Sequence, residues 1–348
     1  MKKVAVGLSG GIDSTFCAYL LKKEGWNVIG FTLKFYPQDN RCCDVESLYQ
    51  TKRFCHKLRI PHYVIDVEDL FKREIISYFI KSYLTGLTPN PCAFCNRIIK
   101  FGYFFEKIKS LGIDYLATGH YVRVEKKNRR VFLKRAKDEN KTQEYFLSLI
   151  NPQILKSLVF PLGDYTKEEI REEIKRLVKE KGIFFRERKE SYDICFIKNK
   201  HYTEFIEENI DSFCEGEIKH IKGEILGKHK GIHYFTYGQR EGLGINWSKP
   251  LYVIDIEEKT HTVVVGEKEN LFKDKFIVKE CNWFLNPVEF KDIKVKIRYS
   301  SPLYDCDLEI KDNFTLVHLK EKVDTPTPGQ IVSFYYEDIL LGGGVIGK

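Results

Sequence analysis

The sequence predicts an α/β fold: a doubly wound parallel sheet, followed by a small mixed domain and a C-terminal β-barrel. Through the first half of the 348 residues, strands and helices alternate in units of the length that gives a parallel sheet with right-handed crossovers. After about residue 205, short strands and many glycines replace this pattern. From Phe276 onward, apolar and polar residues alternate as in β-strands. We therefore expect domains at residues 1–205, 206–270 and 271–348.

The first domain opens with a buried strand at Lys3–Leu8 and a helix at Ser14–Lys23. Asn90-Pro91 has the pattern of an N-cap followed by proline at the first helical position. Thr166–Glu169 is a capping box, and Gly182 follows the end of its helix. The remaining predicted elements are strands at Asn27–Phe35, His62–Val67 and Asp114–Thr118, and helices at Val45–Leu58, Leu70–Leu84 and from Pro91 to about Leu111. In the last domain, strands are expected at Ile293–Ser301 and Gln330–Tyr336.

Composition and charge narrow the class of protein. Hydrophobic residues make up 43% and charged residues 30%, as in ordinary globular proteins. The longest apolar runs are too short to span a bilayer, and the run behind the first two lysines ends at Leu8, too early for a signal peptide. We expect a cytoplasmic protein with no membrane partner. The net charge of +8 fits either a polyanionic partner such as nucleic acid or a solvated lysine-rich surface.

The segment Ser9-Gly10-Gly11-Ile12-Asp13-Ser14 lies between the first strand and the first helix. Glycines let the backbone approach a ligand, N–H groups at a helix start bind anions, and the serines add hydroxyl donors. An aspartate in a phosphate cradle indicates a nearby cation, for which Mg²⁺ is suited. The spacing excludes a Walker loop, which needs a lysine after its last glycine, and the dinucleotide fingerprint. A tight glycine turn without a ligand is the alternative.

This loop resembles the pyrophosphate-binding motif of the ATP pyrophosphatases. The resemblance implies ATP cleavage between the α and β phosphates, activation of a carbonyl oxygen as its adenylate, and release of pyrophosphate. It does not identify the substrate. In a parallel sheet, ligands bind at the carboxyl ends of the strands, where this loop and Thr118-Gly119-His120 both emerge.

The ten cysteines of a chain expected to be cytosolic do not indicate a disulfide framework, because thiols are kept reduced in that compartment. Cys92 and Cys95 lie three residues apart in the first turns of a predicted helix, where the helix dipole and nearby basic residues lower a thiol pKa. They are therefore reactive cysteines or two packed thiols. Cys195, behind Asp193 in a short apolar run, is by itself a strand cysteine. Four isolated cysteines are expected to be small buried hydrophobes: Cys17, Cys214, Cys281 and Cys306.

Over nearly its whole length the chain resembles the family of tRNA-specific 2-thiouridylases, which replace the 2-oxygen of the wobble uridine of tRNA with sulfur. The resemblance rests on several blocks in the same order: GLSGGIDST (7–15), NPCAFCNRIIKF (90–101), LATGHY (116–121), QEYFL (143–147), SYDICFI (191–197), YGQREGLGI (237–245), DTPTPGQ (324–330) and LGGGVI (341–346). It implies an adenine-nucleotide-hydrolase type of parallel sheet, ATP and Mg²⁺ as cofactors, and the tRNA anticodon loop as partner. It also implies a sulfur donor such as a cysteine desulfurase or a sulfur-relay protein.

The resemblance implies a role for each matching residue. Cys195 accepts sulfur as a persulfide, Cys95 completes the transfer and leaves a disulfide, and Asp13 serves the reacting phosphates or magnesium. The ATP-binding residues implied are Gly7, Leu8, Ser9, Gly10, Gly11, Asp13, Ser14, Leu33 and Gly119. The tRNA-binding residues implied are Lys141, Gln143, Tyr237, Gln239, Arg240, Arg298 and Tyr299.

Two departures from the family pattern leave alternatives open. Many members carry aspartate where this chain has Cys92, and three thiolates at Cys92, Cys95 and Cys195 suit a [4Fe-4S] cluster with one iron open to sulfide. The persulfide and cluster routes both remain. At 141–146 the family pattern is Lys-Asp-Gln-Ser, but Thr142 and Glu144 stand here. Contact with tRNA in that segment is then left to Lys141 and Gln143.

On the RNA side, a loop nucleotide must be splayed out before its 2-position is reached. Tyr234, Phe235 and Tyr237 near Arg240 suit single-stranded bases, or form a hydrophobic strand that ends in a glycine turn. Lys294, Lys296 and Arg298 alternate along one predicted strand face, as phosphate contacts or as a solvated face.

Cys42-Cys43 with Cys55-His56 lacks the spacing of a zinc module, so packing beside the ATP pocket is expected there. Asp193 is expected to be a surface carboxylate. The rival functions are another ATP pyrophosphatase, such as an amidotransferase-type synthetase or a tRNA lysidine-type ligase, and a non-catalytic ATP-dependent RNA-binding protein.

Overall fold

The computed structural model describes residues 2–35, 45–128, 130–183, 185, 194–197 and 200–348. Contacts within the chain divide it into two compact units. The first comprises Met1–Glu74, Cys92–Lys198 and Asp338–Leu340, and the second comprises Ile75–Pro91, Asn199–Glu337 and Leu341–Lys348. The predictions for Cys42, Cys43 and Asp193 lie outside the described residues.

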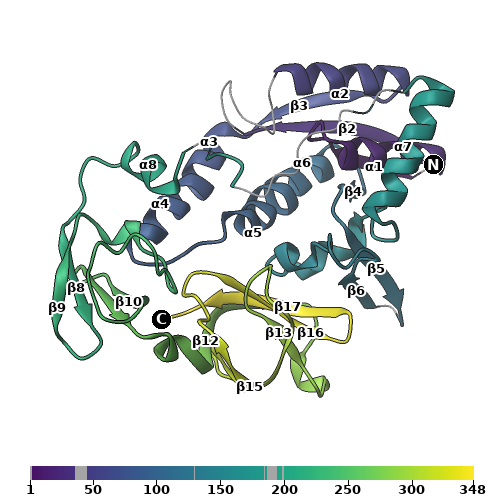
Figure 1. The fold of residues 1–348 in the computed structure, drawn as a ribbon. Helices are drawn as coiled ribbons and strands as arrows, with labels where there is room; N and C mark the ends of the chain where they lie inside the picture. Colours follow the sequence, from purple (N-terminus) through teal and green to yellow (C-terminus); the bar gives the residue numbers. More distant parts are fainter. Residues whose placement is uncertain (1, 36–44, 129, 184, 186–193, 198–199) are drawn as a thin grey trace. The chain divides into compact units, whose positions relative to one another are not determined.

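A five-stranded parallel sheet forms the centre of the first unit, in the order β3-β2-β1-β4-β7. Figure 1 labels its strands β2, β3 and β4. Its strands are β1 (Lys3–Gly7), β2 (Asn27–Lys34), β3 (His62–Asp66), β4 (Tyr115–Ala117) and β7 (Leu158–Val159). β1 pairs with β2 on one side and with β4 on the other, so the strand order reverses beside β1. The predicted doubly wound α/β fold is confirmed, and the carboxyl ends of β1 and β4 lie where such folds bind ligands.

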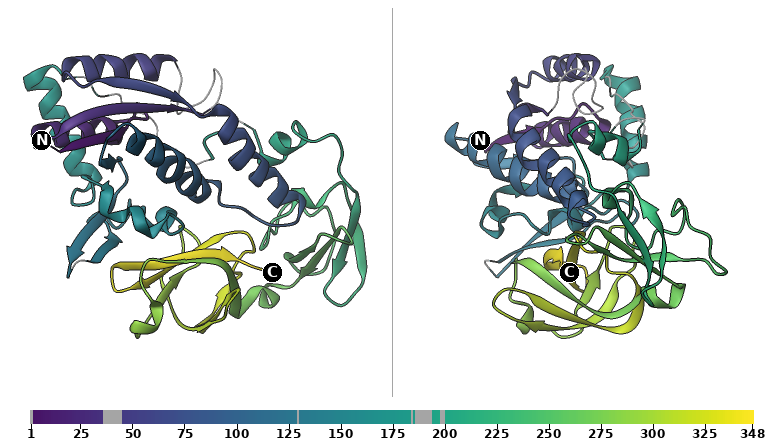
Figure 2. Two further views of the ribbon diagram at one scale, coloured as in Figure 1. Left: turned by 180° about the vertical axis from the view of Figure 1, so that it is seen from behind. Right: turned by 90° about the vertical axis from the view of Figure 1, so that its left-hand side faces the viewer.

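Helices cover both faces of this sheet, as the two views of Figure 2 also show. Val4 and Val6 point to one face and join a core with α1, α2 and α7. On the other face Phe31 packs against Phe104, with ring centroids 5.6 Å apart. The helices of this unit are α1 (Ile12–Lys23), α2 (Val45–Lys57), α3 (Glu68–Phe71), α5 (Pro91–Cys95), α6 (Phe104–Ser110) and α7 (Lys167–Lys181), with short helical turns at Glu144–Leu147 and Pro152–Ser157.

Both of the long helices predicted between residues 70 and 111 contain a π-helical segment that the sequence does not predict. The first run is α3, a π-helix at Lys72–Ile76, and α4 (Ser77–Leu84). The second is α5, a π-helix at Asn96–Tyr103, and α6. Such segments are rare and occur often at functional sites. The second one begins immediately after Cys95.

The start of α7 has the predicted capping box. The Thr166 hydroxyl accepts a hydrogen bond from the Glu169 backbone N–H at 3.2 Å, and the Glu169 carboxylate accepts one from the Thr166 backbone N–H at 2.7 Å. Gly182 ends the helix in the left-handed conformation. Elsewhere in this unit the hairpin β5 (Val122–Lys127) and β6 (Arg130–Arg135) pairs through β6 with residues 339–340 of β17 (Ile339–Ile346).

The second unit contains a small four-stranded sheet in the order β10-β11-β8-β9. Its elements are β8 (Gly216–His220), β9 (Ile225–His229), β10 (Tyr252–Glu257) and β11 (Thr262–Gly266), with α8 (Tyr202–Glu207) and short turns at Ile232–Tyr234 and Lys268–Leu271. Phe235 is buried in the core of this sheet, and Tyr234 and Tyr237 pack against that core. The burial expected in the hydrophobic alternative is therefore confirmed for Phe235. The strand expected there is wrong, because a short helical turn stands at Ile232–Tyr234 and Phe235 belongs to no strand.

The same unit ends in the predicted barrel. Its strands are β12 (Phe272–Trp283), β13 (Lys294–Lys296), β14 (Tyr304–Ile310), β15 (Thr315–Asp324), β16 (Ile331–Tyr336) and β17, with a short turn at Pro287–Glu289. They follow the order β12-β15-β14-β13-β16-β17, and pairing of β12 with β17 closes the barrel. The strand predicted at Ile293–Ser301 is wrong beyond Lys296. A turn ends it there, in which the Ser301 N–H and hydroxyl both donate to the Arg298 carbonyl at 3.1 and 3.0 Å.

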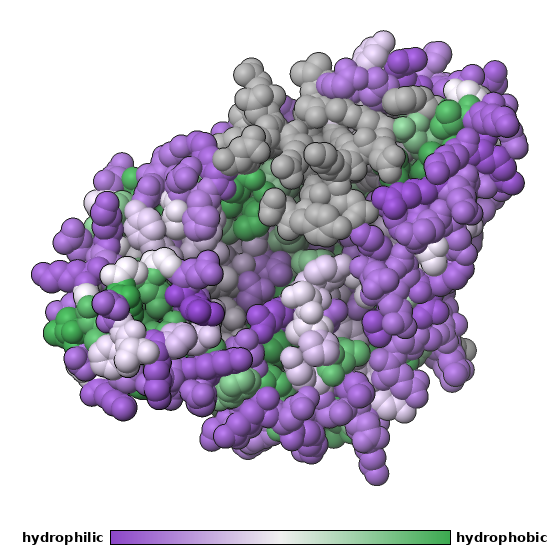
Figure 3. Space-filling view, viewed as in Figure 1, coloured by the Kyte–Doolittle hydropathy of each residue, from purple (hydrophilic) through white to green (hydrophobic). Residues whose placement is uncertain are grey.

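The cysteines expected to be buried differ in their exposure. Cys17 and Cys306 are buried, and burial raises the pKa of both thiols, that of Cys306 to about 12. Cys281 is half-buried, and Cys214 is exposed, so the prediction is wrong for Cys214. Hydrophilic residues cover most of the face drawn in Figure 3. Among the described residues, no helix has both the length and the apolar character needed to cross a membrane.

Candidate ATP site

A cavity of about 260 Å³ lies at the carboxyl ends of β1, β2 and β4 in the first unit. Residues from the loop after β1, from β2, from the run behind Cys95 and from the loop after β4 form its wall. The wall contains Gly7, Leu8, Ser9, Asp13, Ser14, Phe31, Leu33, Phe35, Lys100, Phe104, Thr118, Gly119, His120 and Gln143. The structure thus brings together seven of the predicted ATP-binding positions, while Gly10 and Gly11 belong to the same loop without lining the cavity.

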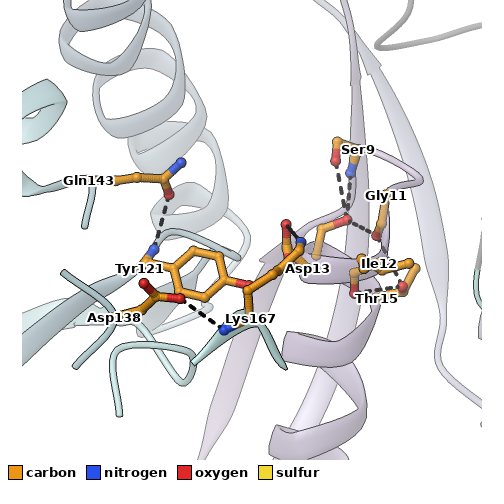
Figure 4. Close-up of polar contacts among 10 residues, drawn as sticks. Ser9, Gly11, Ile12, Asp13, Thr15, Tyr121, Asp138, Gln143 and Lys167 are labelled. Atoms are coloured by element: carbon orange, nitrogen blue, oxygen red, sulfur yellow. Dashed lines mark hydrogen bonds and ion pairs between the residues drawn. The ribbon is translucent and has the colours of Figure 1, made fainter. Parts of the chain in front are cut away.

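The loop after β1 is held in shape by its own hydroxyl groups. The Ser14 hydroxyl donates to the Gly11 carbonyl at 3.0 Å and accepts from the Ser9 backbone N–H at 3.2 Å. The Thr15 hydroxyl donates to the same carbonyl at 3.0 Å. These bonds fix the start of α1, where N–H groups have no partner within the helix and are available to an anion. Figure 4 shows this arrangement.

Two glycines allow other segments to approach this loop closely. Gly10 has a φ of +79°, and a Cβ there would lie 3.1 Å from the Ser47 Cβ on α2. A Cβ on Gly119 would lie 2.8 Å from both the Asp13 carbonyl carbon and the Ser14 nitrogen. Backbone atoms cannot move aside as a side-chain end can. Only glycine therefore lets the loop after β4 rest directly on the loop after β1.

Asp13 is bonded to two residues that the sequence analysis did not connect with it (Figure 4). The Lys167 ammonium donates to both carboxylate oxygens at 2.7 and 2.8 Å. The Tyr121 hydroxyl donates to one of them at 2.7 Å. The sequence pattern identified Lys167 only as part of the capping box. A lysine at the first position of a helix is electrostatically unfavourable there, because its charge opposes the helix dipole. That mismatch was the sequence signal for a carboxylate partner.

His120 forms a neutral part of the cavity wall. The Thr118 hydroxyl and the His120 Nδ1 lie 2.7 Å apart, and the Phe101 and Phe160 rings lie 5.7 and 6.2 Å from the imidazole. Burial, together with the charge of Lys100, lowers the pKa of His120 to about 3. His120 is therefore uncharged at neutral pH and adds no positive charge for phosphates.

Gln143, a predicted tRNA-binding residue, lies in the wall of this cavity. Its side-chain oxygen accepts a hydrogen bond from the Tyr121 N–H at 3.0 Å. The flanking substitutions from the family pattern form a buried pair, in which the Thr142 hydroxyl donates to the Glu144 carboxylate and accepts from the Ala136 N–H at 2.8 Å. These hydrogen bonds hold the segment 142–144 within the first unit. The tRNA contacts of Lys141 and Gln143 stay predictions.

The helix that carries Cys92 and Cys95 is attached to the same cavity. It begins at Pro91, as predicted, with Cys92 exposed and Cys95 buried at 8% exposure. The next residue, Asn96, donates from its side chain to the Phe146 carbonyl at 3.0 Å. Further along this run, Lys100 and Phe104 line the cavity. The reactivity expected of Cys95 remains a prediction, but the position of its helix relative to the cavity is now fixed.

Cys195 lies in a turn, so the prediction of a strand at this cysteine is wrong. The Ile197 N–H donates to the Ile194 carbonyl at 3.1 Å and closes the turn. The adjacent Phe196 is buried against Phe71, with ring centroids 5.6 Å apart, and Phe71 in turn packs against Phe35 at 5.3 Å. Because Phe35 lines the cavity, the Cys195 turn is attached to the cavity wall by a row of three aromatic rings.

The residues that hold a cofactor are limited by this geometry. A carboxylate offers about four lone-pair sites, and the three hydrogen bonds to Asp13 leave one for Mg²⁺, which commonly uses one protein carboxylate plus phosphate oxygens. The site therefore fits a magnesium ion that arrives with ATP. A cluster fits less well. Among the described residues, which include Cys92, Cys95 and Cys195, no three histidine, cysteine, aspartate or glutamate side chains are grouped to hold a metal.

The other predicted tRNA-binding residues lie in the second unit. The Tyr237 hydroxyl donates to the Asp255 carboxylate at 2.8 Å, and the Gln239 oxygen accepts from the Thr236 N–H at 2.9 Å. Arg240 is exposed and lines a hollow of about 440 Å³ together with residues 242–251.

In the barrel, Arg298 donates to the Asp324 carbonyl at 3.2 Å, and the Lys296 ammonium lies 5.3 Å from the ring centre of Tyr299. Because Arg298 lies past the end of β13, the predicted alternation of Lys294, Lys296 and Arg298 along one strand is wrong for Arg298. The tRNA contacts themselves stay predictions.

Comparison with known proteins places the whole chain in one family. Three family models match in succession: the tRNA methyl transferase HUP domain at residues 2–199, the tRNA methyl transferase PRC-barrel domain at 203–267 and the aminomethyltransferase beta-barrel domain at 273–346. The tRNA-specific 2-thiouridylase MnmA of Aquifex aeolicus is 43% identical over 355 residues, covering 99% of this chain and 98% of the relative. That of Clostridioides difficile is 39% identical over 359 residues, covering 100% and 98%.

Among solved structures, the U34-tRNA thiolase NcsA from Methanococcus maripaludis with its [4Fe-4S] cluster shows 20% identity and a TM-score of 0.37, covering 56% of this chain and 61% of the other. A TM-score this low does not establish a shared fold or a shared cofactor. The full-length matches do establish descent. This chain belongs to the family of tRNA-specific 2-thiouridylases.

Proposed function

We propose that this protein uses ATP to replace the 2-oxygen of the wobble uridine in the tRNA anticodon loop with sulfur. ATP binds with its phosphates over the loop Ser9–Ser14 and its adenosine toward the apolar part of the cavity. The uridine 2-oxygen attacks the α-phosphorus and pyrophosphate leaves. Sulfur then displaces AMP. The single observation that carries the proposal is the cavity, because its wall unites the nucleotide loop with the segment behind Cys95. Phe35 in that wall packs against Phe71, which packs against Phe196 beside Cys195.

The cavity suits the adenosine part of ATP in polarity. Phe31, Leu33 and Phe104 provide an apolar surface for a purine, while Ser9 and Ser14 belong to the loop at the start of α1. Binding sites of this kind are mostly apolar with a few placed polar groups. A volume of about 260 Å³ is small for the whole nucleotide, so the triphosphate extends along the loop toward the opening.

The sulfur step is written so that atoms and electrons balance. A donor protein, such as a cysteine desulfurase or a sulfur-relay protein, leaves a persulfide on Cys195. The terminal sulfur attacks C2 of the adenylated uridine, and AMP leaves. The Cys95 thiolate then attacks the Cys195 sulfur, the thiolated uridine leaves as a thiolate, and a Cys95–Cys195 disulfide forms. A thiol reductant supplies the two electrons that restore both thiols.

Magnesium, held by the phosphates and Asp13, would withdraw charge from the phosphates during adenylation. We route no step through an iron–sulfur cluster, because the described cysteines do not form a three-ligand group. We further infer that the domains run from 1–205, 206–270 and 271–348, close to the family-model matches, and that the last two meet the tRNA in the cytoplasm.

The proposal is tested by nucleoside analysis of tRNA after incubation with the protein, ATP, Mg²⁺ and a sulfide or persulfide source. The wild type should form 2-thiouridine only with ATP. Cys195→Ser should form none with a persulfide donor, yet still release pyrophosphate. Cys214→Ser, at an exposed cysteine of the second unit, is the matched control and should behave as wild type. Thiolation that persists in Cys195→Ser would refute the assigned route.

A further inference from the structure

We propose that Lys167 is a positioning residue of the adenylation site: it neutralises and orients Asp13 so that ATP can bind beside that carboxylate. This inference rests on the proposed function, because it assumes that the cavity binds ATP. Lys167 is the first residue of α7 and does not itself line the cavity. Its effect on ATP must therefore pass through Asp13, which does line it.

The burial of Lys167 is the first argument. Only 6% of its side chain is exposed, whereas 34% of the Asp13 side chain is exposed and Asp13 lines the cavity. Lysine is almost never buried without a partner. The ammonium contacts both Asp13 oxygens and lies 5.8 Å from the ring centre of Tyr121. The carboxylate and the aromatic face together compensate this buried charge.

The position of Lys167 in its helix is the second argument. A cation at a helix N-terminus opposes the helix dipole, and the neighbouring Glu168 and Glu169 are the residues favoured there. The chain anchors this unfavourable position firmly: the Lys167 backbone N–H donates to Asp138 at 3.0 Å, inside a complete capping box. The helix start therefore carries a lysine despite the electrostatics, and from there its ammonium reaches Asp13.

The charge of the cavity wall is the third argument. The ionisable side chains in the described wall are Asp13, Lys100 and the neutral His120. Asp13 and Lys100 cancel, so without Lys167 the wall has no net charge to offer a polyphosphate. With Lys167 bonded to Asp13, the same region carries one net positive charge. A bare carboxylate in the cradle would repel the phosphate oxygens that Mg²⁺ does not cover, and Lys167 removes that repulsion.

Orientation of Asp13 is a second consequence of the same contacts. Lys167 bridges both oxygens, and the Tyr121 hydroxyl fixes one of them. Tyr121 is itself held by Gln143, which accepts its backbone N–H and lines the cavity. The carboxylate is thus held by two side chains from separate segments, one of which is fixed in turn by Gln143, as a preorganised site requires.

The test is a double-mutant cycle on ATP affinity, measured by calorimetry with Mg²⁺ and without tRNA. We expect Lys167→Met to weaken ATP binding by about tenfold or more, since it leaves a partly buried carboxylate uncompensated beside the phosphates. In an Asp13→Asn background, the same substitution should change the affinity by less than about threefold, because no charge is left to neutralise. Lys167→Arg should retain most of the affinity.

Lys137→Met is the matched control. Lys137 forms an exposed ion pair with Glu169 on the same helix, at 2.6 Å, and its loss should leave ATP affinity unchanged. Thermal unfolding of each variant separates affinity loss from misfolding, and a merely structural lysine would shift the melting temperature without the coupling. Equal losses in both backgrounds would make Lys167 a direct phosphate ligand and overturn the inference. A wild-type protein that does not bind ATP would refute the proposed function and this inference together.

Discussion

Gly119→Ala is the substitution whose effect follows most directly from the geometry. The new Cβ would lie 2.8 Å from two backbone atoms of Asp13 and Ser14, and 3.4 Å is the lower limit of ordinary contact. The loops after β1 and β4 must therefore separate by about 0.6 Å, the difference between these two distances. Overpacking of this kind costs about 1–3 kcal/mol of unfolding free energy. A misplacement of about 1 Å at a reacting centre costs about 100-fold in rate, so a loss on the order of tenfold in pyrophosphate release is expected.

The assay is tRNA-dependent pyrophosphate release under saturating ATP, with chemical unfolding measured in parallel. Gly182→Ala is the matched control: it forces alanine into a left-handed helix end, far along the chain from the loop, and no heavy atom of the described residues lies within 4 Å of the new Cβ. It should lose about 1–2 kcal/mol of stability, the cost of placing an L-residue in the left-handed conformation, without slowing release. If Gly119→Ala releases pyrophosphate at the wild-type rate, the close approach of the two loops does not position the reaction, and the reasoning fails.

Three further predictions follow. The wild type should lose more unfolding free energy than His120→Gln as the pH falls from 6.5 to about 3, because His120 takes up a proton in the unfolded chain but not in the folded one. Denaturant titrations across that pH range measure the unfolding free energy of both proteins. If the two free energies change with pH in parallel, the prediction is contradicted. Asn96→Ala removes the hydrogen bond to the Phe146 carbonyl, which should lower the unfolding free energy by about 1–2 kcal/mol. Because Asn96 follows Cys95 directly, sulfur transfer should slow more than pyrophosphate release. Equal slowing of both steps would count against this prediction. Protein purified without oxygen should be colourless, free of iron and active; visible absorption that Cys92→Ser abolishes would instead establish the cluster.

Much of the fold was predictable because its signals are local. The strand–helix alternation, the proline at the start of α5 and the capping box at Thr166 all depend on a few neighbouring residues. The π-helix at Asn96–Tyr103 was not predictable, because no sequence pattern specifies a hydrogen bond to the fifth residue back. The early end of β13 was also not predictable: the alternating pattern continues to Ser301, but a turn closed by the Ser301 hydroxyl follows Lys296.

The nucleotide-binding motif of the site was predictable from the sequence, but the residues that contact this motif in the fold were not. The loop Ser9–Ser14 carries its chemistry in its own residues, so its place at the end of β1 followed directly. The bond between Asp13 and Lys167 joins residues 154 positions apart, and the sequence gives no distance between them. The turn at Cys195 likewise depends on Phe71 and Phe35, whose packing is tertiary. The sequence indicated which residues of the loop bind phosphates, whereas only the fold shows which residue compensates the charge of Asp13.

The sulfur relay is tested most directly by a single turnover. Wild-type protein loaded with persulfide on Cys195 is mixed with ATP, Mg²⁺ and tRNA in the absence of reductant, and both the tRNA nucleosides and the protein's peptides are analysed by mass spectrometry. One disulfide linking Cys95 and Cys195 should appear in step with each 2-thiouridine formed. Formation of 2-thiouridine while both cysteines remain reduced would contradict the relay.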